Sequence, residues 1–441
     1  MHDIILHAFD WEYKQLADNA DQIAEIGYGA VLIAPPLYSD PNGSEWWQRY
    51  QPKDYRVIRS YLGGKADLSA AIKALHDKGV MVYADIVFNH MANESSREER
   101  KNDSLNFPGT VELLKYREQQ QFEEDRLYGN LDTGLFSPWD FHSCGNIENW
   151  NDEYQSTERS LSGLPDLELN AWVIEQQRTC LRALNEMGFD GYRVDAVKHL
   201  PDEHIRQVFD TSDTAGKFIF GEALTSNDTE ERIFLWPLMS ETRMSFYDFP
   251  LYETLRRVFS PGGSMRELAD PAAYGQALPW HRAITVAVTH DIPNNDGFRG
   301  QLLSAQDEFL AKVYIMGRDG GVPMIYSDHN ESADKYQEDY NRWANSWNRD
   351  DIKSMISFHN AVHGSPQRTL YEADGFLVFA RGDNSIVAIN KTDYWQTPTI
   401  SMGTLRQGDY KCLIHGHIMK LTECIFNIAI PPGQAQMWLS C

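Results

Sequence analysis

The segment from Gly191 to His199 places four charged or ionisable side chains directly behind a short apolar run. Residues Phe189 to Val194 are predicted to form a buried strand, on which Arg193 and Asp195 point to the same face because side chains alternate. Two charges on one face of a buried strand are costly unless they pair or take part in a reaction. The segment is therefore either a structural ion pair or part of a catalytic site.

Carboxylates and histidines also follow other apolar runs. Three of the carboxylates, Asp195, Glu222 and Asp291, are predicted to lie at neighbouring strand ends. Glycoside hydrolysis needs two carboxyl groups across the scissile bond, and a third can hold sugar hydroxyls. A single Asp at a strand end is usually a cap or a structural residue. Three of them, with Arg193, His90 and His290 beside them, argue against a purely structural role.

Eight apolar runs, mostly separated by helix-like stretches, are predicted to position these residues. Near-continuous apolar strands that alternate with helices indicate a parallel sheet covered on both faces, here the α/β fold class. Eight such units indicate a (β/α)8 TIM barrel, whose active site lies at the carboxyl ends of its strands. The runs are Ile4–Phe9, Ala30–Ala34, Val80–Phe88, Phe189–Val194, Phe218–Phe220, Met244–Phe249, Ala283–Val288 and Val322–Tyr326.

Two departures from the repeat predict further domains. The connection from His90 to Ala171 is polar and far longer than a strand-to-helix loop needs, so it indicates an inserted subdomain after strand 3. After a helix at Ile352–Val362, short alternating runs indicate an antiparallel β-sandwich. These runs are Gly375–Ala380, Ser385–Asn390, Gln396–Ile400, Tyr410–Ile414 and Cys424–Ala429. We therefore predict a barrel over 1–90 and 167–350, an irregular subdomain over 91–166 and a C-terminal all-β domain over 351–441.

The composition excludes several classes of partner. The chain has 441 residues and a formal net charge of −24, which argues against nucleic acid because phosphate binding needs a basic surface. Apolar runs stay well short of a membrane span, so no membrane partner is expected. The 12 Trp and 21 Tyr suit stacking on sugar rings.

Cysteines and the N-terminus bear on location. The five cysteines contain no CxxC pair, so a cysteine zinc site is not expected. Cys412 and Cys424 flank a predicted hairpin, and spacing alone leaves open whether they form a disulfide. The start, Met1-His2-Asp3, lacks the basic region of a signal peptide. Either the protein is cytoplasmic or a leader has been removed.

Six segments, in this order along the chain, resemble the motifs of the α-amylase family of retaining glycoside hydrolases, and the resemblance spans almost the whole sequence. They are Asp85–His90, Leu164–Glu168, Gly191–His199, Gly221–Ala223, Val288–Asp291 and Gly321–Tyr326. The resemblance implies that Asp195 is the nucleophile, Glu222 the general acid and base, and Asp291 a transition-state stabiliser. It also implies that Arg193 keeps Asp195 ionised. Glu222 needs a raised pKa, so fewer cations are expected around it.

The resemblance further implies contacts with the sugar chain. His90 and His290 would bind hydroxyls of the sugar at the cleaved bond, and Tyr50 would stack on that sugar. Trp46 or Trp47 would contact sugars further along the donor side, although a buried aromatic pair is the alternative. The remaining implied contacts are a rim or hydroxyl contact from Gln51 and acceptor-sugar contacts from Lys198 and His199. Lys198-His199 and the Leu164–Leu167 form of its motif resemble true α-amylases, which implies that starch, maltodextrins and other α-1,4-glucans are the substrates.

A structural calcium ion is implied as well. By the family pattern, Asn89 and Asp166 would supply side-chain oxygens, and His199 and Thr157 backbone carbonyls. Thr289 stands where chloride-activated members carry Asn, so a chloride site is not expected. The family habit is secretion, with a cytoplasmic location as the alternative, and a monomer is the default for this architecture. A transglycosylase or an exo-acting oligosaccharide-forming enzyme shares these motifs, and a non-catalytic carbohydrate-binding protein is a remote alternative.

Overall fold

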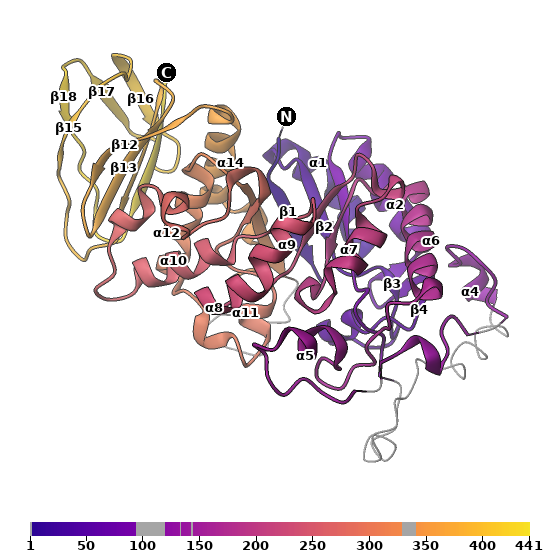
Figure 1. The fold of residues 1–441 in the computed structure, drawn as a ribbon. Helices are drawn as coiled ribbons and strands as arrows, with labels where there is room; N and C mark the ends of the chain where they lie inside the picture. Colours follow the sequence, from indigo (N-terminus) through magenta and orange to yellow (C-terminus); the bar gives the residue numbers. More distant parts are fainter. Residues whose placement is uncertain (1, 94–119, 133, 143, 329–340) are drawn as a thin grey trace. The chain divides into compact units, whose positions relative to one another are not determined.

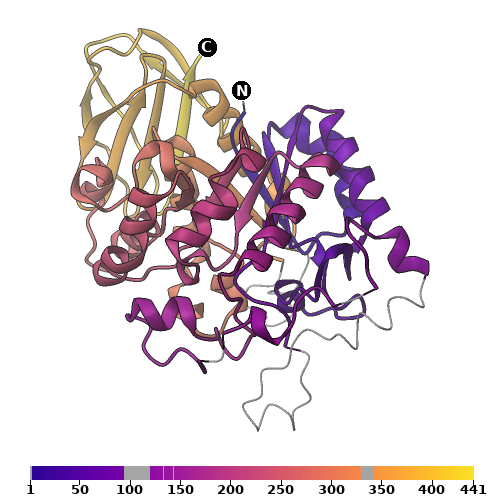
Figure 2. The same cartoon turned by 45° about the vertical axis from the view of Figure 1, so that its right-hand side comes forward.

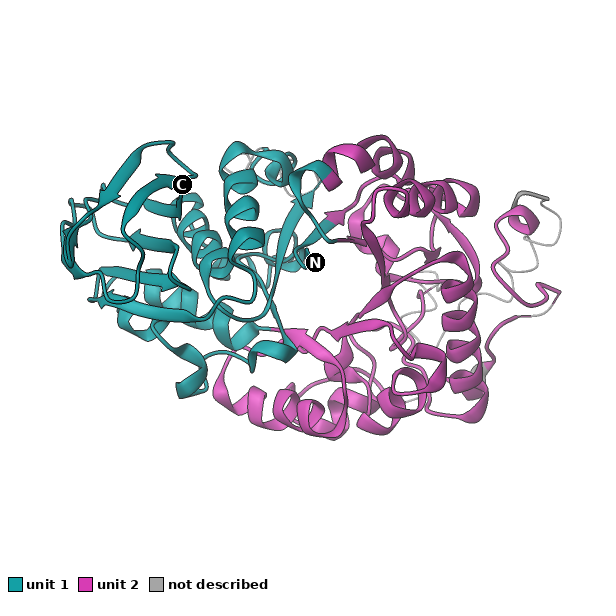
Figure 3. Ribbon diagram, turned by 90° about the horizontal axis from the view of Figure 1, so that it is seen from above, with its two compact units in different colours: residues 1–7, 25–29, 248–441 teal, residues 8–24, 30–247 magenta. Residues whose placement is uncertain are grey.

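The computed structural model describes residues 2–93, 120–132, 134–142, 144–328 and 341–441. The chain forms two compact units (Figure 3). One unit comprises residues 8–24 and 30–247, and the other comprises residues 1–7, 25–29 and 248–441. The sequence-predicted insert, residues 91–166, lies partly outside the described residues.

Eight strands form a closed barrel in the order β1-β11-β10-β9-β8-β7-β6-β2, which confirms the predicted fold. Neighbouring strands pair in parallel wherever the register is resolved, as between β6 and β7 and between β7 and β8. The strands are short and almost wholly buried because both faces are covered. Their bounds are β1 Ile5–Phe9, β2 Ala30–Ile33, β6 Met81–Ile86, β7 Gly191–Val194, β8 Phe218–Gly221, β9 Ser245–Tyr247, β10 Ala283–Thr285 and β11 Val322–Asp328.

The helix before β7 shows how the sequence positions the catalytic strand. The Asn170 side chain accepts a hydrogen bond from the amide of Val173 at the start of α6 (Ala171–Met187). The helix ends at Gly188, whose φ of 106° is readily adopted by glycine. The other helices of the barrel and its connections are α1 Tyr13–Ile26, α2 Lys65–His76, α7 Asp202–Phe209, α8 Asp228–Glu230, α9 Trp236–Glu241, α10 Phe249–Phe259, α11 Asp291–Asn294, α12 Ala305–Gly317 and α14 Asp350–Val362.

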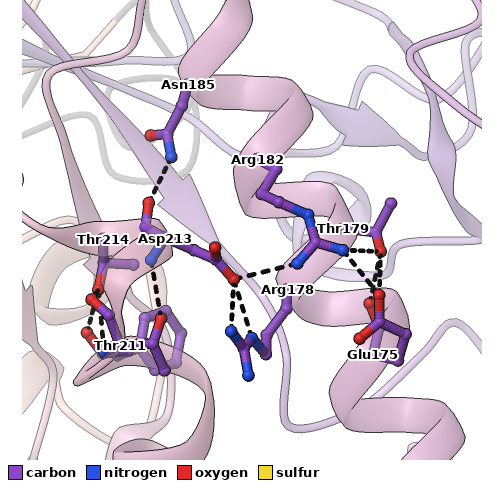
Figure 4. A network of polar contacts seen from close by, with 9 residues as sticks. Glu175, Arg178, Thr179, Arg182, Asn185, Thr211, Asp213 and Thr214 are labelled. Carbon is purple, nitrogen blue, oxygen red and sulfur yellow. Dashed lines mark hydrogen bonds and ion pairs between the residues drawn. The ribbon is translucent and has the colours of Figure 1, made fainter.

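A polar network on α6 ties this helix to the turn that precedes β8 (Figure 4). The Asp213 carboxylate accepts hydrogen bonds from Arg178 at 2.9 Å and Arg182 at 3.0 Å. Arg182 also donates to Glu175 at 2.7 Å, and Asn185 donates to the Asp213 carbonyl at 2.6 Å. The network fixes α6 against the segment that leads into β8.

The connections carry smaller elements. A three-stranded sheet follows β2 and consists of β3 (Leu37–Tyr38), β4 (Asp54–Ser60) and β5 (Gly63–Gly64). The sequence analysis did not predict this sheet. Within the described part of the insert lie α4 (Gln120–Glu124) and α5 (Glu153–Glu158). Antiparallel bridges pair His90 with Asp166 and Phe141 with Leu167. The first bridge joins the two ends of the insert, and the second joins Phe141, inside the insert, to the residue that follows it.

The C-terminal segment forms the predicted antiparallel sandwich (Figures 1 and 2). A six-stranded sheet in the order β12-β13-β14-β19-β16-β17 faces a two-stranded sheet of β15 and β18. Side chains from both sheets, among them Val378, Ile386, Ile400 and Trp438, form one buried cluster. The strands are β12 Gln367–Glu372, β13 Phe376–Arg381, β14 Ser385–Asn390, β15 Thr399–Ser401, β16 Gly408–Cys412, β17 Ile418–Leu421, β18 Ile425–Asn427 and β19 Ala435–Ser440.

Three of these strands were missing from the sequence prediction. The outer strands β12 and β17 are polar or half-exposed, as edge strands commonly are, so they show little apolar alternation. β19 is buried between β14 and β16, but the polar Gln436 interrupts its apolar run. Cys412 lies in the sandwich core and Cys424 is exposed, and both are free thiols, so the disulfide left open by the sequence is not formed. None of the described helices is long and apolar enough to cross a membrane.

Candidate active site

The parallel register of β6, β7 and β8 sets three carboxylates beside one another. Asp85 on β6 pairs with Arg193 on β7, and Val194 on β7 pairs with Gly221 on β8. Asp195 and Glu222 each follow the last residue of their strand. Their amides still bond to the neighbouring strand, that of Asp195 to Ile86 and that of Glu222 to Val194, both at 2.9 Å. The barrel ladder itself therefore fixes the backbone of both predicted catalytic residues.

Arg193 lies at the centre of this site and is fully buried. Its Nη1 is 2.7 Å from Asp195 Oδ1 and 2.8 Å from Asp85 Oδ1, and its Nη2 is 2.8 Å from Glu222 Oε2. One guanidinium thus contacts three carboxylates. The rings of Tyr50 and Tyr247 each lie with their centroids 5.8 Å from the guanidinium carbon.

Burial and Arg193 act in opposite directions on the acids. Burial raises the pKa of Asp195 to about 6, although the charge of Arg193 lowers it. Burial likewise raises the pKa of Asp85 to about 7 against the effect of Arg193. Arg193 favours the ionised form of Asp195, in the direction the sequence implied, but desolvation is the larger effect. The three acids compete for a single cation, which favours a proton retained within the group.

The expectation that fewer cations surround Glu222 than Asp195 is wrong. The same guanidinium that contacts Asp195 through Nη1 reaches Glu222 through Nη2 at 2.8 Å. The planar fork of an arginine can serve two acids on adjacent strands at once, which residue types and spacing do not reveal.

Aromatic residues predicted to bind sugar lie on the 3-10 helix Trp46–Tyr50. The ring of Trp46 packs between Phe9 and Tyr50, with centroid distances of 6.0 and 5.9 Å. Trp47 is 44% exposed and lines a pocket of about 380 Å³ together with Gln51. Trp46 thus belongs to a partly buried aromatic group, while Trp47 is exposed on the pocket wall. The Tyr50 hydroxyl donates to Asp85 Oδ2 at 2.9 Å, which holds its ring beside Arg193.

The predicted polar contacts in the same unit are buried and anchored. His90 Nε2 donates to the Tyr50 carbonyl at 2.9 Å, and His199 Nδ1 donates to the Ser156 carbonyl at 2.9 Å. Burial lowers the pKa of each histidine to about 4, so both are neutral at neutral pH. Neutral histidines can still exchange hydrogen bonds with sugar hydroxyls.

Lys198 is held by neighbours rather than projecting outward. Its Nζ lies 3.2 Å from the Leu224 carbonyl, 3.4 Å from Glu230 Oε2 and 4.7 Å from the centre of the Phe234 ring. Burial lowers the pKa of Lys198, although Glu230 opposes this shift. To contact an acceptor sugar, the Lys198 amine must therefore give up one of these contacts or bind the sugar in addition to them.

Asp291 and His290 lie in the other compact unit. Asp291 is the first residue of α11, and its Oδ2 is 3.5 Å from His290 Nε2. The His290 ring meets the His7 ring edge-on at a centroid distance of 5.5 Å. His290 is buried, and the Asp291 side chain is 19% exposed. The carboxylate thus retains access to a ligand.

Oxygen-bearing groups predicted to bind calcium come from segments in direct contact. The bridge between His90 and Asp166 sets Asn89 beside Asp166, and Asp166 Oδ2 is 2.7 Å from His142 Nδ1. His142 Nε2 reaches Glu158 on α5 at 3.1 Å. Thr157 is the neighbour of Glu158 on this helix, and the bond from His199 to Ser156 places His199 against the same helix. The four predicted ligands therefore belong to one group of contacting segments.

The sequence analysis assigned no role to two residues that contact the predicted site residues, Asp85 and His142. Asp85 appeared only as the first residue of a motif, without a role, although a carboxylate inside an apolar strand was its signal. His142 lies in the polar insert, where the sequence has no periodicity to mark it, and it bridges Asp166 to Glu158 and Glu168.

Comparison with known proteins identifies the family. The model of the α-amylase catalytic domain matches residues 12–257. An α-amylase from Aeromonas hydrophila is 47% identical over 404 residues, which cover 89% of this chain and 85% of that protein.

Solved structures share the fold. A variant of α-amylase I from Eisenia fetida in complex with maltohexaose superposes with a TM-score of 0.79 at 20% identity, covering 100% of this chain and 97% of that one. A cyclomaltodextrin glucanotransferase with a three-domain ABC distribution gives a TM-score of 0.70 at 21% identity, covering 97% of this chain and 90% of that one. The family model and the curated relative agree: the chain belongs to the α-amylase family of glycoside hydrolases.

Proposed function

We propose that this enzyme hydrolyses α-1,4-glucosidic bonds of starch and related α-glucans with retention of anomeric configuration. The observation that carries the proposal is the shared position of Asp195 and Glu222 on Arg193, at the ends of two adjacent barrel strands. Retaining hydrolysis needs one carboxylate to attack and a second to carry a proton. A buried pair of acids on one cation supplies both states.

In the first step, Asp195 attacks the anomeric carbon and forms a glycosyl ester. Glu222 donates its proton to the glycosidic oxygen, which leaves as the hydroxyl of the shortened chain. The charge of Arg193 favours the ionised form of Asp195, which is the form that attacks. Desolvation favours the protonated form of the neighbouring Asp85. Asp291 would hold hydroxyls of the distorted sugar.

In the second step, Glu222 accepts a proton from water as the water oxygen attacks the anomeric carbon. The ester bond to Asp195 breaks and its carboxylate is regenerated, so two inversions give net retention. The sugar would stack on Tyr50, with His90 and His290 on its hydroxyls. Trp47 and Gln51, which line one pocket with each other, would bind the donor end of the chain.

A calcium ion is part of the proposal. The donors are oxygens, as calcium prefers, and Asp166 is a buried carboxylate whose pKa is raised to about 7 by desolvation. A dication there would offset that desolvation. Asn89 and Asp166 would contribute side-chain oxygens, and Thr157 and His199 would contribute carbonyls. Bound calcium would clamp the insert to the barrel strands beside the catalytic acids.

The calcium claim is tested by melting temperature. Metal-stripped protein is expected to melt lower than native protein, and added calcium is expected to restore the difference, because calcium binds only the folded site. Asp166→Asn is expected to remove most of the calcium response. A melting temperature that is unchanged by chelator and by calcium return would remove calcium from the proposal.

Product analysis tests the reaction itself. Soluble starch is incubated with the enzyme, and early products are followed by chromatography and by the anomeric form of their reducing ends. Mixed maltooligosaccharides with α-anomeric ends are expected. Cyclic or lengthened glucans would instead identify a transglycosylase, and β-anomeric products would contradict retention.

A secreted location also belongs to the proposal, on the strength of family resemblance. The described cysteines are all free thiols, so no disulfide among them supports an oxidising compartment. Fractionation of cells that express the complete gene tests this location: activity in the medium is expected, and activity confined to the cell interior would contradict it.

A further inference from the structure

Asp3, His359 and His363 form a compact cluster that the proposed reaction does not use. Asp3 lies two residues before β1, whereas the residues assigned to hydrolysis follow the carboxyl ends of strands. His359 lies in the last turn of α14, and His363 caps its C-terminal end. The two histidines are four residues apart, a spacing that brings side chains together on one helix face.

The ligand atoms of the three residues are close to one another. His359 Nε2 is 2.9 Å from Asp3 Oδ1, and His363 Nδ1 is 3.5 Å from Asp3 Oδ2. One potential ligand atom from each residue lies within 4.8 Å of the other two. In a tetrahedral zinc site with bonds of about 2.0–2.1 Å, ligand atoms stand about 3.3–3.5 Å apart. Small side-chain rotations therefore suffice to admit an ion.

We propose that Asp3, His359 and His363 bind a divalent transition-metal ion of the zinc class. Two imidazoles and one carboxylate suit Zn²⁺, Co²⁺ or Ni²⁺, whereas Ca²⁺ takes oxygen ligands. Three protein ligands leave a fourth position for water. This site is chemically distinct from the proposed calcium site.

The surroundings of His359 orient it as a ligand. His359 is 4% exposed as a whole residue, and its Nδ1 donates to the carbonyl of Met316 at 3.0 Å. A carbonyl only accepts, so Nδ1 carries the proton and Nε2 faces Asp3. Metal-binding histidines commonly have their second nitrogen fixed in this way. A metal ion bound by both Nε2 and Asp3 would take the place of this direct contact.

The local charge also favours a cation, although not uniformly. The C-terminal end of α14 carries the negative end of the helix dipole, and the chain has a net charge of −24. Arg381 lies within electrostatic range of Asp3 and opposes an ion there. Its guanidinium is engaged with the carbonyls of Gly317 at 2.9 Å and Ser365 at 2.8 Å.

An ion at this site would join the segment before the first barrel strand to the helix that precedes the β-sandwich. All three ligands belong to the same compact unit. The expected consequence is greater stability of that unit, since the ion binds the folded ligand set and few of these contacts exist in the unfolded chain.

The test is a titration of the full chain with Co²⁺ and then Zn²⁺ in saturating calcium. Exposed thiols are first blocked with N-ethylmaleimide, because Cys144, Cys424 and Cys441 could otherwise bind the same metals. The visible absorption of bound Co²⁺ reports histidine coordination, and melting temperature reports stabilisation by Zn²⁺. We expect one tightly bound ion per chain and a higher melting temperature.

Variants assign the site. His363→Asn alters an exposed residue, so folding is expected to persist, and Asp3→Asn removes the carboxylate. Each is expected to weaken Co²⁺ binding at least about tenfold and to abolish the Zn²⁺ stabilisation. His417→Asn is the matched control, since His417 is exposed and stacks on His415 in the turn between β16 and β17. It should leave binding unchanged.

Two results would overturn the proposal: no ion bound by the blocked wild-type protein, or binding that survives in both Asp3→Asn and His363→Asn. Starch hydrolysis by His363→Asn in calcium is measured alongside. Because that activity depends on other residues, failure of the metal site and failure of the proposed hydrolysis give separate signals.

Discussion

The Arg193 network and the Asp213 network both join arginines to carboxylates, and both belong to the unit of residues 8–24 and 30–247. Arg193 is fully buried and serves three acids on adjacent strands. Asp213 accepts from two arginines on the outer helix α6, whose side chains are 31% and 40% exposed. The two networks therefore differ in the ratio of cations to acids and in access to water.

The pKa values of the acids in the two networks are shifted in opposite directions. Burial raises the pKa of Asp195 to about 6 and that of Asp85 to about 7, despite Arg193. At Asp213 desolvation is also the largest influence, but the hydrogen bonds and charges of Arg178 and Arg182 together outweigh it, so its pKa is lowered. The interior acids Asp85 and Asp195 thus hold protons more readily than free carboxyl groups do, whereas the outer network holds an ion pair that positions a helix.

The largest effect is expected from Asp195→Asn. Loss of the nucleophile's charge should lower kcat on soluble starch by about 10³-fold or more, while glucan binding and melting temperature change little. Initial rates, binding of maltooligosaccharide and thermal melts measure the three quantities. Asp213→Asn is the matched control and should keep kcat within about twofold. If Asp195→Asn retained more than a few per cent of activity, the nucleophile would be misassigned.

Glu222→Gln comes next, with an expected loss of about 10²–10⁴-fold on starch. An aryl maltooligosaccharide with a good leaving group should suffer less in its first step, because that leaving group needs no proton. Azide should restore turnover, since it attacks the intermediate without a general base, and should give an azide product of retained configuration. Equal losses on both substrates, without rescue, would argue against an acid–base role.

Asp85→Asn probes the stability of the interior network. Its folded-state pKa of about 7 exceeds the value of about 3.9 in an unfolded chain, so proton binding favours the folded state. Its contribution to the unfolding free energy is therefore fully present below about pH 4 and is lost as pH rises through about 7. The variant should gain stability relative to wild type between these limits in urea denaturation. A difference that is constant with pH would contradict this.

Asp213→Asn should have the smallest effect and the opposite pH dependence. A lowered pKa means that the Asp213 contribution is present above the unfolded value and is lost as pH falls through the folded value. Exposure of both arginines limits the expected destabilisation at neutral pH to about 1 kcal/mol. The same urea denaturation series measures this destabilisation. A larger loss of unfolding free energy at low pH than at neutral pH would contradict the predicted difference between the two networks.

The sequence predicted the barrel because its strands are buried on both faces and appear as apolar runs. The helical run Ala171–Met187 and the Gly188 that follows it likewise predicted α6. Strands β12 and β17 were not predicted because outer strands of a sheet need little apolar alternation.

At the candidate site, residue types identified Asp195 and Glu222 but not their sharing of Arg193. That contact depends on register between β7 and β8 and on which nitrogen of the guanidinium faces each acid. Asp85 was visible only as a charge within an apolar run. The group around His142 depends on bridges between the ends of the insert, which local patterns do not encode.

The most direct test of the central claim is intact-protein mass spectrometry of Glu222→Gln after reaction with an α-maltooligosaccharyl fluoride. This substrate needs no general acid, and the variant lacks the base that would release the intermediate. The account predicts a mass increase of one glycosyl group, mapped to Asp195 by peptide analysis and absent when Asp195→Asn is added. Two results would contradict this account. One is that the folded variant consumes the glycosyl fluoride without forming an adduct, and the other is an adduct on another carboxylate.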